Sequence, residues 1–434
     1  MNGEIEIGEP RMMADGGVEL SACLRTGGKH WKQYLRVRGD SLHPEGLDNS
    51  GDVWTVLFLH KMMEYGGHYK VRGAVSASLL PGLDRYVRAW VNLQPARYNA
   101  VTLEPDTVED DRGRVLRPEC LACFSGGLDA CFTAFRHARV MAGPQNQQLN
   151  ACLMVRGADI RKDYEADWKE ASRMARELTD DLGIPRFYTV ETNFRDMHCA
   201  YGMSYFSMLV ACMRIFDREY GHLMLGSDNC FSYFHLASGN NPVTNHFLSS
   251  HGVEVITDGA EYTRTEKAAV VAQWPLALQK LRVCYQGKDL SCNCGTCGKC
   301  RRTRLNFLAV GVKELPCMPP LQNEDELLDF MMTPVEQLEI SLLLEYLDAH
   351  PLRPVPVWES RLRAMMGSPA VAMPEKKCWF SRFAYWCRKT IACVGGKKRC
   401  NRRGKRGHRS SREPSSFIRV SREGESSFSS EERH

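Results

Sequence analysis

The sequence predicts an α/β protein built on a doubly wound parallel sheet. From about residue 116 onward, short apolar runs alternate with helical stretches, which is the pattern of parallel strands joined by crossover helices. Two of those helical stretches stop at a glycine, the residue favoured just past a helix end. Across 434 residues, 43% hydrophobic and 25% charged side chains match ordinary globular usage, so a disordered, collagen-like or coiled-coil chain is excluded.

The first 115 residues predict a small α+β region. Apolar runs such as 53–59 and 87–91 alternate with turn residues, and the region contains no recognisable chemical motif. The segment 104–114 is acidic and rich in turn residues and has no hydrophobic periodicity. We therefore expect a linker there, with a domain boundary near Arg112.

The parallel sheet is expected between residues 116 and 310. Its strands are predicted at 120–124, 151–155, 186–190 and 222–225. Helical spacing of apolar residues predicts helices over 165–182 and 203–220, each followed by a glycine. Because ligands of such sheets bind at the carboxyl ends of the strands, we look for the functional site there.

The last 124 residues predict a helical cap and a basic tail. The cap, 311–373, contains a leucine-rich helix expected over 335–350. The tail, 374–434, holds 17 of the 57 Lys and Arg residues but only 6 of the 52 Asp and Glu residues, so the body before it is net negative. The tail could bind RNA or an acidic partner, and a solvated extension is the alternative.

The cysteine content and the chain start indicate the compartment. No stretch approaches the roughly 18 apolar residues of a membrane span, and the start lacks the basic and apolar regions of a secretion signal. In so long a chain, 18 cysteines predict metal ligation and buried free thiols rather than disulfides. We expect a cytoplasmic protein with no transmembrane segment, and a homodimer is left open.

One motif carries the predicted chemistry: Ser125-Gly126-Gly127-Leu128-Asp129-Ala130, between the strand 120–124 and a helix. Two glycines let the backbone turn sharply, and the N–H groups of the turn and the helix start then converge on one spot that favours negative charge. That spot suits a pyrophosphate. Ser125 can add a hydroxyl donor, while Asp129 can hold Mg²⁺ or cap its own helix in an ordinary tight connection.

These residues resemble the S-G-G-x-D-S signature of the PP-loop ATP pyrophosphatases, with Ala130 in place of the final serine. The resemblance implies a PP-loop (HUP-type) fold whose loop binds the pyrophosphate of ATP. It also implies that a substrate oxygen attacks the α-phosphorus to give an adenylate, from which a nitrogen or sulfur nucleophile displaces AMP. ATP and Mg²⁺ are the implied cofactors.

A second motif predicts a metal site. Cys294, Cys297 and Cys300 form a C-x₂-C-x₂-C run, and a fourth thiolate upstream completes a tetrahedral set. We favour Cys284 over Cys292, because Cys292 and Cys294 are separated by only one residue and cannot easily coordinate the same ion. Zinc is the expected occupant, and an iron–sulfur cluster is the alternative.

The placement of this cysteine site is similar to that in the 7-cyano-7-deazaguanine synthases. Thr263 to Lys267 resembles that family's segment entering a helix, and the resemblance implies a catalytic Lys267. From the residues alone, we expect a capping box of Thr263 with Glu266, and a Lys267 that faces solvent or a substrate carboxylate. The implied ATP contacts beyond the loop are Met154, Val155, Gly226, Ser227 and Asp228.

Together these motifs predict an ATP-dependent, adenylate-forming carbon–nitrogen ligase. Its substrate is expected to be a small-molecule carboxylate or a modified base, since 198–204 and 230–235 depart from the synthase pattern around the substrate pocket. One alternative is tRNA modification, which would need a catalytic cysteine such as Cys131 or Cys199. The other is a non-catalytic ATP-sensing module, which fits the missing serine at Ala130.

Overall fold

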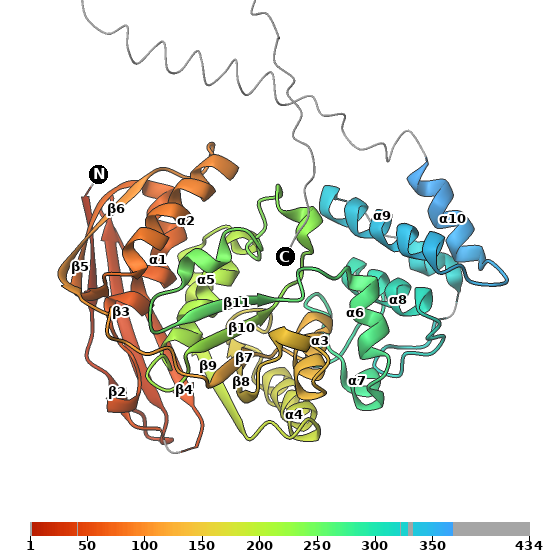
Figure 1. Ribbon diagram of the computed structural model, residues 1–434, viewed down its shortest axis with the longest axis horizontal. Coiled ribbons are helices and arrows are strands. Elements are labelled where there is room, and N and C mark those ends of the chain that lie inside the picture. The colour runs from red at the N-terminus through yellow and green to blue at the C-terminus, as the bar shows by residue number, and fades with distance from the viewer. Residues whose placement is uncertain (1, 41, 322, 329–332, 368–434) are drawn as a thin grey trace, which may run out of the picture. The chain divides into compact units, whose positions relative to one another are not determined.

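A single sheet of 11 strands organises the protein (Figure 1). The computed structural model describes residues 2–40, 42–321, 323–328 and 333–367, and these fall within one compact unit. The sheet is mostly parallel and carries helices on both faces, so the predicted α/β class is confirmed. The predicted basic tail lies outside the described residues.

The predicted parallel strands form one half of this sheet. They are β7 (Cys120–Cys123), β8 (Leu149–Arg156), β9 (Arg186–Thr192), β10 (His222–Gly226) and β11 (Glu254–Asp258). Their spatial order is β11-β10-β7-β8-β9, and every neighbouring pair is parallel. The strand order reverses between β7 and β10, which is the point where doubly wound sheets open a crevice.

Helices cover both faces of this half. They are α3 (Leu128–Ala138), α4 (Glu165–Asp181), α5 (Tyr201–Arg214), α6 (Arg264–Val271), α7 (Pro275–Lys280) and α8 (Gly298–Ala309). Alternate residues of β7 face opposite sides: Leu121 packs with the α5 cluster, while Cys120 and Ala122 pack with the cluster formed by α3 and α4. The sheet is therefore buried on both sides, as parallel sheets usually are.

The helix predicted over 165–182 is confirmed by α4, whereas the one predicted over 203–220 is too long. α5 ends at Arg214, because the carbonyl of Ile215 accepts a hydrogen bond from the Asp48 N–H at 2.7 Å instead of continuing the helix. Residues 215–219 form turns. Apolar spacing alone does not reveal this contact with a distant segment.

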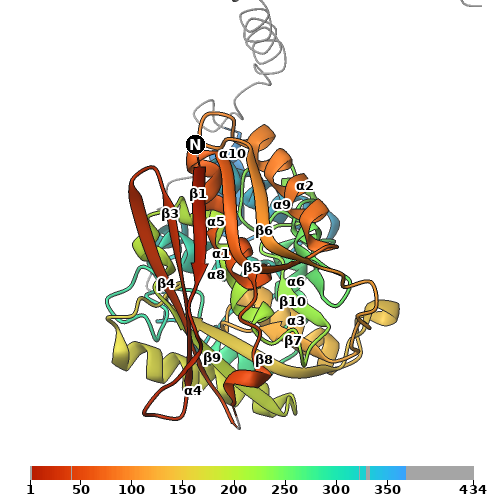
Figure 2. The same ribbon diagram turned by 90° about the vertical axis from the view of Figure 1, so that its left-hand side faces the viewer.

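The N-terminal region extends the same sheet (Figure 2). Its elements are β1 (Asn2–Ile7), β2 (Arg11–Met12), β3 (Val18–Thr26), β4 (Lys29–Arg38), α1 (Gly51–Tyr65), β5 (Gly67–Ser76), α2 (Leu79–Leu93) and β6 (Val101–Glu109). β4 pairs antiparallel with β9, with Leu35 opposite Thr192. The sheet is thus continuous across the boundary predicted near Arg112.

The linker predicted over 104–114 is wrong over its first part. β6 runs through Glu109 and pairs with β5 along the sheet edge. An edge strand tolerates Pro105, which lacks an N–H, and leaves charged side chains in solvent. The acidic composition of 104–109, from which we predicted a linker, is therefore compatible with an exposed edge strand.

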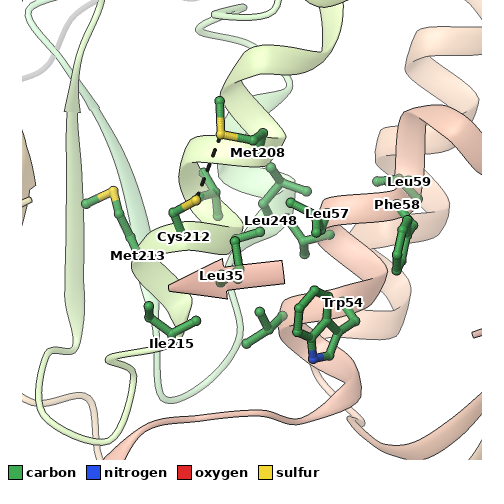
Figure 3. Packing of buried hydrophobic residues seen from close by; sticks show 14 of the residues in the cluster. Leu35, Trp54, Leu57, Phe58, Leu59, Met208, Cys212, Met213, Ile215 and Leu248 are labelled. Carbon is green, nitrogen blue, oxygen red and sulfur yellow. Dashed lines mark hydrogen bonds between the residues drawn. The ribbon is translucent and has the colours of Figure 1, made fainter. Parts of the chain in front are cut away.

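The two halves share one hydrophobic core. α1 is buried along almost its whole length, and Trp54 and Leu57 lie on it. Figure 3 shows these side chains near Leu35 of β4 and near Met208 and Cys212 of α5. α1 and α5 therefore pack across the junction of the two halves.

The C-terminal cap is helical, as predicted. It contains α9 (Pro334–Ala349), which confirms the helix expected over 335–350, and α10 (Val357–Met366). Buried Ile340, Leu343 and Leu362 form a small core with Leu305 of α8. None of the helices in the described ranges combines the length and apolar character needed to cross a bilayer.

Candidate functional site

The glycine-rich loop lies between the end of β7 and the start of α3, as the sequence predicts. Gly126 has a φ of +73°, a left-handed conformation that a side chain would strain. Gly127 begins α3 with an extended backbone, and its N–H donates to Ser125 Oγ at 3.3 Å. Within the part of the chain that the structure describes, no side chain caps this helix, so the N–H groups of Leu128, Asp129 and Ala130 are left for a ligand.

Asp129 does not cap its own helix but faces two cations of α6. Its carboxylate lies 3.2 Å from Arg264 Nη2 and 3.5 Å from Lys267 Nζ. Although burial works in the opposite direction, the positive charges of Arg264, Lys267 and Lys299 hold the pKa of Asp129 below its ordinary value. The side chain is therefore a carboxylate at neutral pH.

Lys267 faces neither solvent nor an open substrate site, the two positions expected from the sequence. It is 1% exposed, and its ammonium donates to the carbonyl of Ser227 and contacts Asp129. The expected capping box is confirmed: Thr263 Oγ1 accepts from the Glu266 N–H, and Glu266 accepts from the Thr263 N–H. This cap fixes the start of α6 and so holds Lys267 behind Asp129.

Asp228 is a second carboxylate at the same place, with different surroundings. One oxygen accepts a 2.7 Å hydrogen bond from Tyr205 Oη, while Oδ1 is buried and has no hydrogen-bond partner among the described residues. Burial raises the pKa of Asp228, and the neighbouring Asp129 adds to the rise. The two aspartates therefore titrate in opposite directions from their ordinary values.

A cavity of about 540 Å³ opens beside the loop. Most of the predicted ATP contacts line it: Ser125, Gly127, Leu128, Asp129, Ala130, Met154, Val155, Gly226 and Asp228. Gly126 and Ser227 are not part of the lining. The carbonyl of Gly126 instead accepts from the Arg282 N–H at 2.8 Å, and the Ser227 N–H donates to the carbonyl of Asp258 at 2.7 Å.

Gly226 is needed where β10 passes α3. A Cβ at this position would lie 2.6 Å from the carbonyl oxygen of Asp129 and 3.0 Å from Thr133 Oγ1. The absence of a side chain therefore lets the two sides of the crevice approach each other. The predicted contact region at 226–228 thus faces the loop across the point where the strand order reverses.

Several lining residues were not among the individual site residues predicted from the sequence. They include Arg195, Tyr201, Tyr205, Arg264, Arg282, Tyr285, Lys299, Arg302 and Glu339. The guanidinium of Arg195 lies 3.8 Å from the ring centroid of Tyr201. The four-residue spacing of Tyr201 and Tyr205 places both on one helix face, which is the signal that could have found them.

The predicted cysteine set comes together. The sulfurs of Cys284, Cys294, Cys297 and Cys300 all lie within 4.8 Å of one another. Cys292 is exposed, and its thiol lies 3.8 Å from the carbonyl of Asp289. The choice of Cys284 as the fourth member of the cluster is therefore confirmed.

The geometry of these thiols fits a zinc ion. The Cys284–Cys297 and Cys294–Cys300 sulfur separations are both 3.9 Å, close to the ~3.8 Å edge of a tetrahedron with Zn–S bonds of about 2.3 Å. The Cys297 N–H points at Cys294 Sγ at 3.3 Å, and hydrogen bonds of this kind favour the thiolate. Four such ligands close the coordination shell, which is typical of a structural site.

The thiols required by the tRNA-modification alternative are not activated. Cys131 is fully buried, and burial raises the pKa of its thiol. Burial also raises the pKa of Cys199 to about 12. A nucleophilic cysteine needs a lowered pKa, so neither residue is poised as a thiolate.

Comparisons of this chain with protein-family models, curated proteins and solved structures found no match. The family resemblances noted from the motifs therefore stay predictions. What the cavity can do follows from its own residues.

Proposed function

We propose that this chain is an ATP pyrophosphatase of the adenylate-forming kind, which joins a nitrogen nucleophile to an activated carboxylate. One observation carries the proposal: the uncapped start of α3 and its glycine loop open onto a cavity where the strand order reverses. Doubly wound sheets bind ligands at this position, and a helix start favours phosphate. The resemblance of Ser125–Asp129 to the PP-loop signature points the same way.

The loop supports binding of a triphosphate. The backbone N–H groups of Leu128, Asp129 and Ala130, together with the Ser125 hydroxyl, are the donors that phosphate oxygens require. Ala130 supplies no hydroxyl, so this loop offers one contact fewer than the signature it resembles. Met154 and Val155, at the end of β8, give an apolar surface on which the adenine can pack.

Asp129 is the residue that would hold Mg²⁺ against the phosphates. It lines the cavity as a carboxylate, the ligand type that Mg²⁺ prefers, and Arg264 and Lys267 fix its orientation. The ion would supply charge neutralisation on the phosphate oxygens. Arg264 and Lys267 are thereby positioning residues that act through Asp129.

The reaction has two steps. A substrate carboxylate oxygen bonds to the α-phosphorus, and the bond to the β-phosphate oxygen breaks, which releases pyrophosphate. The nitrogen then bonds to the activated carbonyl carbon, AMP leaves, and the nitrogen gives up a proton. Asp228, with its raised pKa and an unpartnered oxygen, is suited to accept that proton.

The experiment is ATP–pyrophosphate exchange and AMP release, measured with a panel of carboxylic acids including deazapurine carboxylates. Wild-type protein should yield AMP and pyrophosphate in equal amounts with the accepted acid. Asp129→Asn should lower the rate by about 100-fold or more, since charge stabilisation dominates such chemistry. Asp163→Asn, at an exposed position outside the cavity, is the matched control.

Release of ADP and phosphate, or an unchanged rate in Asp129→Asn, would contradict the proposal. Nucleotide binding without pyrophosphate release from any acid would instead favour the ATP-sensing alternative. Cleavage that requires RNA and the tail 374–434 would favour tRNA modification.

A further inference from the structure

Three cations of the cavity, Arg195, Arg282 and Lys299, have no described carboxylate within ion-pair distance. Arg264 pairs with Asp129 and Glu339, and Arg302 also pairs with Glu339. For Arg282 and Lys299, by contrast, no described carboxylate lies within 4.0 Å. Carboxylates of the cavity act on these two cations only over longer distances: Asp129 on Lys299, and Asp159 on Arg282. The cavity therefore contains positive charge with no direct carboxylate partner among the described residues.

Arg195 is a third such cation, but its situation differs. It is exposed, and its guanidinium stacks on the ring of Tyr201. Water can therefore solvate its charge, and no ligand is needed to explain it.

Arg282 is the stronger of the two remaining cases because it is only 5% exposed. Its guanidinium donates only to backbone carbonyls: to Cys284 at 3.1 Å, to Leu290 at 3.3 Å and to Ser125 at 3.4 Å. Its Nε is buried and has no hydrogen-bond partner in the described ranges. A buried cation whose nearest carboxylate, Asp159, lies beyond ion-pair distance is costly, and an anion in the cavity would lower that cost.

Lys299 approaches the cavity from the cysteine site. It lies in the first turn of α8 between Cys297 and Cys300, and its ammonium is 5.2 Å from the ring centroid of Tyr285. Its side chain lines the cavity that also contains Asp129. Its backbone is thus placed by its two cysteine neighbours.

Both residues are part of the cysteine segment, which forms one wall of the cavity. Arg282 lies two residues before Cys284, and its backbone N–H donates to the carbonyl of Gly126 at 2.8 Å. The segment is therefore joined directly to the phosphate-binding loop. A metal ion that fixes the four thiols would also fix Arg282 and Lys299.

We infer that Arg282 and Lys299 bind the phosphate chain of the nucleotide, and that metal loading of the cysteine site sets nucleotide affinity by positioning them. This inference rests on the proposed function. It gives the cysteine site a role in ligand binding beyond holding the fold together. The recognised chemistry is a polyphosphate, so adenosine binding should not depend on these two cations.

The test is calorimetric titration with α,β-methylene-ATP and Mg²⁺, because this analogue cannot be split between its α- and β-phosphates. Lys299→Gln should weaken binding by about tenfold or more, as expected for loss of a charged hydrogen bond. Adenosine affinity should not change. Lys288→Gln removes an exposed lysine of the same segment outside the cavity lining and should bind like wild type.

A second arm tests the metal. Protein stripped by a chelator should bind α,β-methylene-ATP about tenfold or more weakly, and reloading with zinc should restore the affinity. Lys299→Gln leaves all four thiols in place and should retain its metal, so the two effects are separable.

The outcomes separate the inference from the proposed function. Equal affinity of wild type and Lys299→Gln, or of stripped and loaded protein, would overturn the inference while ATP binding itself stands. Failure of the loaded wild type to bind the analogue would overturn the proposed function, and the inference with it.

Discussion

Asp129 and Asp228 face one cavity but differ in their protonation. Cations around Asp129 lower its pKa, whereas burial raises the pKa of Asp228. Pairs of carboxyl groups separated in this way commonly divide their roles in catalysis. Asp129 is suited to hold a cation, and Asp228 is suited to take a proton.

The division predicts a pH dependence. A base works only when deprotonated, so the rate of the amine-dependent step should fall as the pH drops through the raised pKa of Asp228. Asp228→Asn should lose this inflection and about 100-fold in rate. The measurement is kcat/KM against pH for amide formation.

Tyr205→Phe provides the control for that profile. Removing the hydrogen bond from Tyr205, which favours the ionised carboxylate, should move the inflection to higher pH. An inflection that persists in Asp228→Asn would assign it to another group.

A buried acidic cluster lies where α5 meets the N-terminal half. Asp52 pairs with the fully buried Arg214 at 2.9 Å, and Asp48 lies beside them. Asp217 contacts Arg114 at 3.4 Å, but its Oδ1 is buried and meets no hydrogen-bond partner among the residues that the structure describes. Burial raises the pKa of Asp217 to about 7.

Asp217 should therefore make stability depend on pH. Above about pH 4 the unfolded chain releases this proton while the folded chain keeps it, so the stabilisation is lost as the pH rises toward 7. In the wild type, this group should lower the free energy of unfolding by about 2–3 kcal/mol between pH 5 and pH 8. Asp217→Asn should abolish that decrease. Urea denaturation at the two pH values measures this, and Asp163→Asn should retain the wild-type slope.

The contact between β10 and α3 holds the crevice in shape. Gly226 is the residue at which strand and helix backbones meet, and neither backbone can yield easily. Any side chain here pushes the loop away from the strand across the crevice.

Gly226→Ala should destabilise the protein by about 1–3 kcal/mol, because overpacking forces backbone shifts. Its effect on nucleotide affinity should exceed its effect on folding, because the added Cβ would clash with the carbonyl oxygen of Asp129, a residue of the nucleotide site. Thermal unfolding and nucleotide titration measure the two effects. Gly46→Ala, where an added Cβ meets nothing within 4 Å, should be silent in both.

Strands and helices with strong local patterns were predictable from the sequence, whereas elements defined by distant contacts were not. The alternation around β7, β8 and α4 follows from local hydrophobic spacing. The end of α5 depends on a hydrogen bond from Asp48, and β6 depends on pairing with β5. Neither of these long-range contacts can be inferred from neighbouring residues in the sequence.

The candidate site divides in the same way. The loop and the four cysteines are local motifs, so their residues could be named from the sequence. Arg282 and Lys299 reach the cavity only because the cysteine segment folds against Gly126. Lys267 could be placed on α6, but its burial behind Asp129 required the tertiary structure.

The continuous sheet and shared core indicate that the first 110 residues and the nucleotide half fold together. β4 pairs with β9, and α1 packs on α5. Without the N-terminal half, β9 would present an open edge, and apolar residues of α5 such as Met208 would be exposed.

A chain beginning at Arg112 should therefore fail to fold. Circular dichroism and size-exclusion chromatography should find it aggregated or lacking cooperative unfolding. The full chain with Trp54→Ala should lose about 3–5 kcal/mol of stability, because this buried ring lies at the core of the junction. A truncated chain that unfolds cooperatively and binds nucleotide would show that the halves are independent.

Amide hydrogen exchange across the loop, with and without Mg²⁺ and α,β-methylene-ATP, tests the central claim most directly. If the N–H groups of Leu128, Asp129 and Ala130 hold the phosphates, their exchange should slow on nucleotide binding, while the distant turn at Gly27–Gly28 should not change. Nucleotide that binds without protecting these amides, or fails to bind at saturating concentration, would contradict the account.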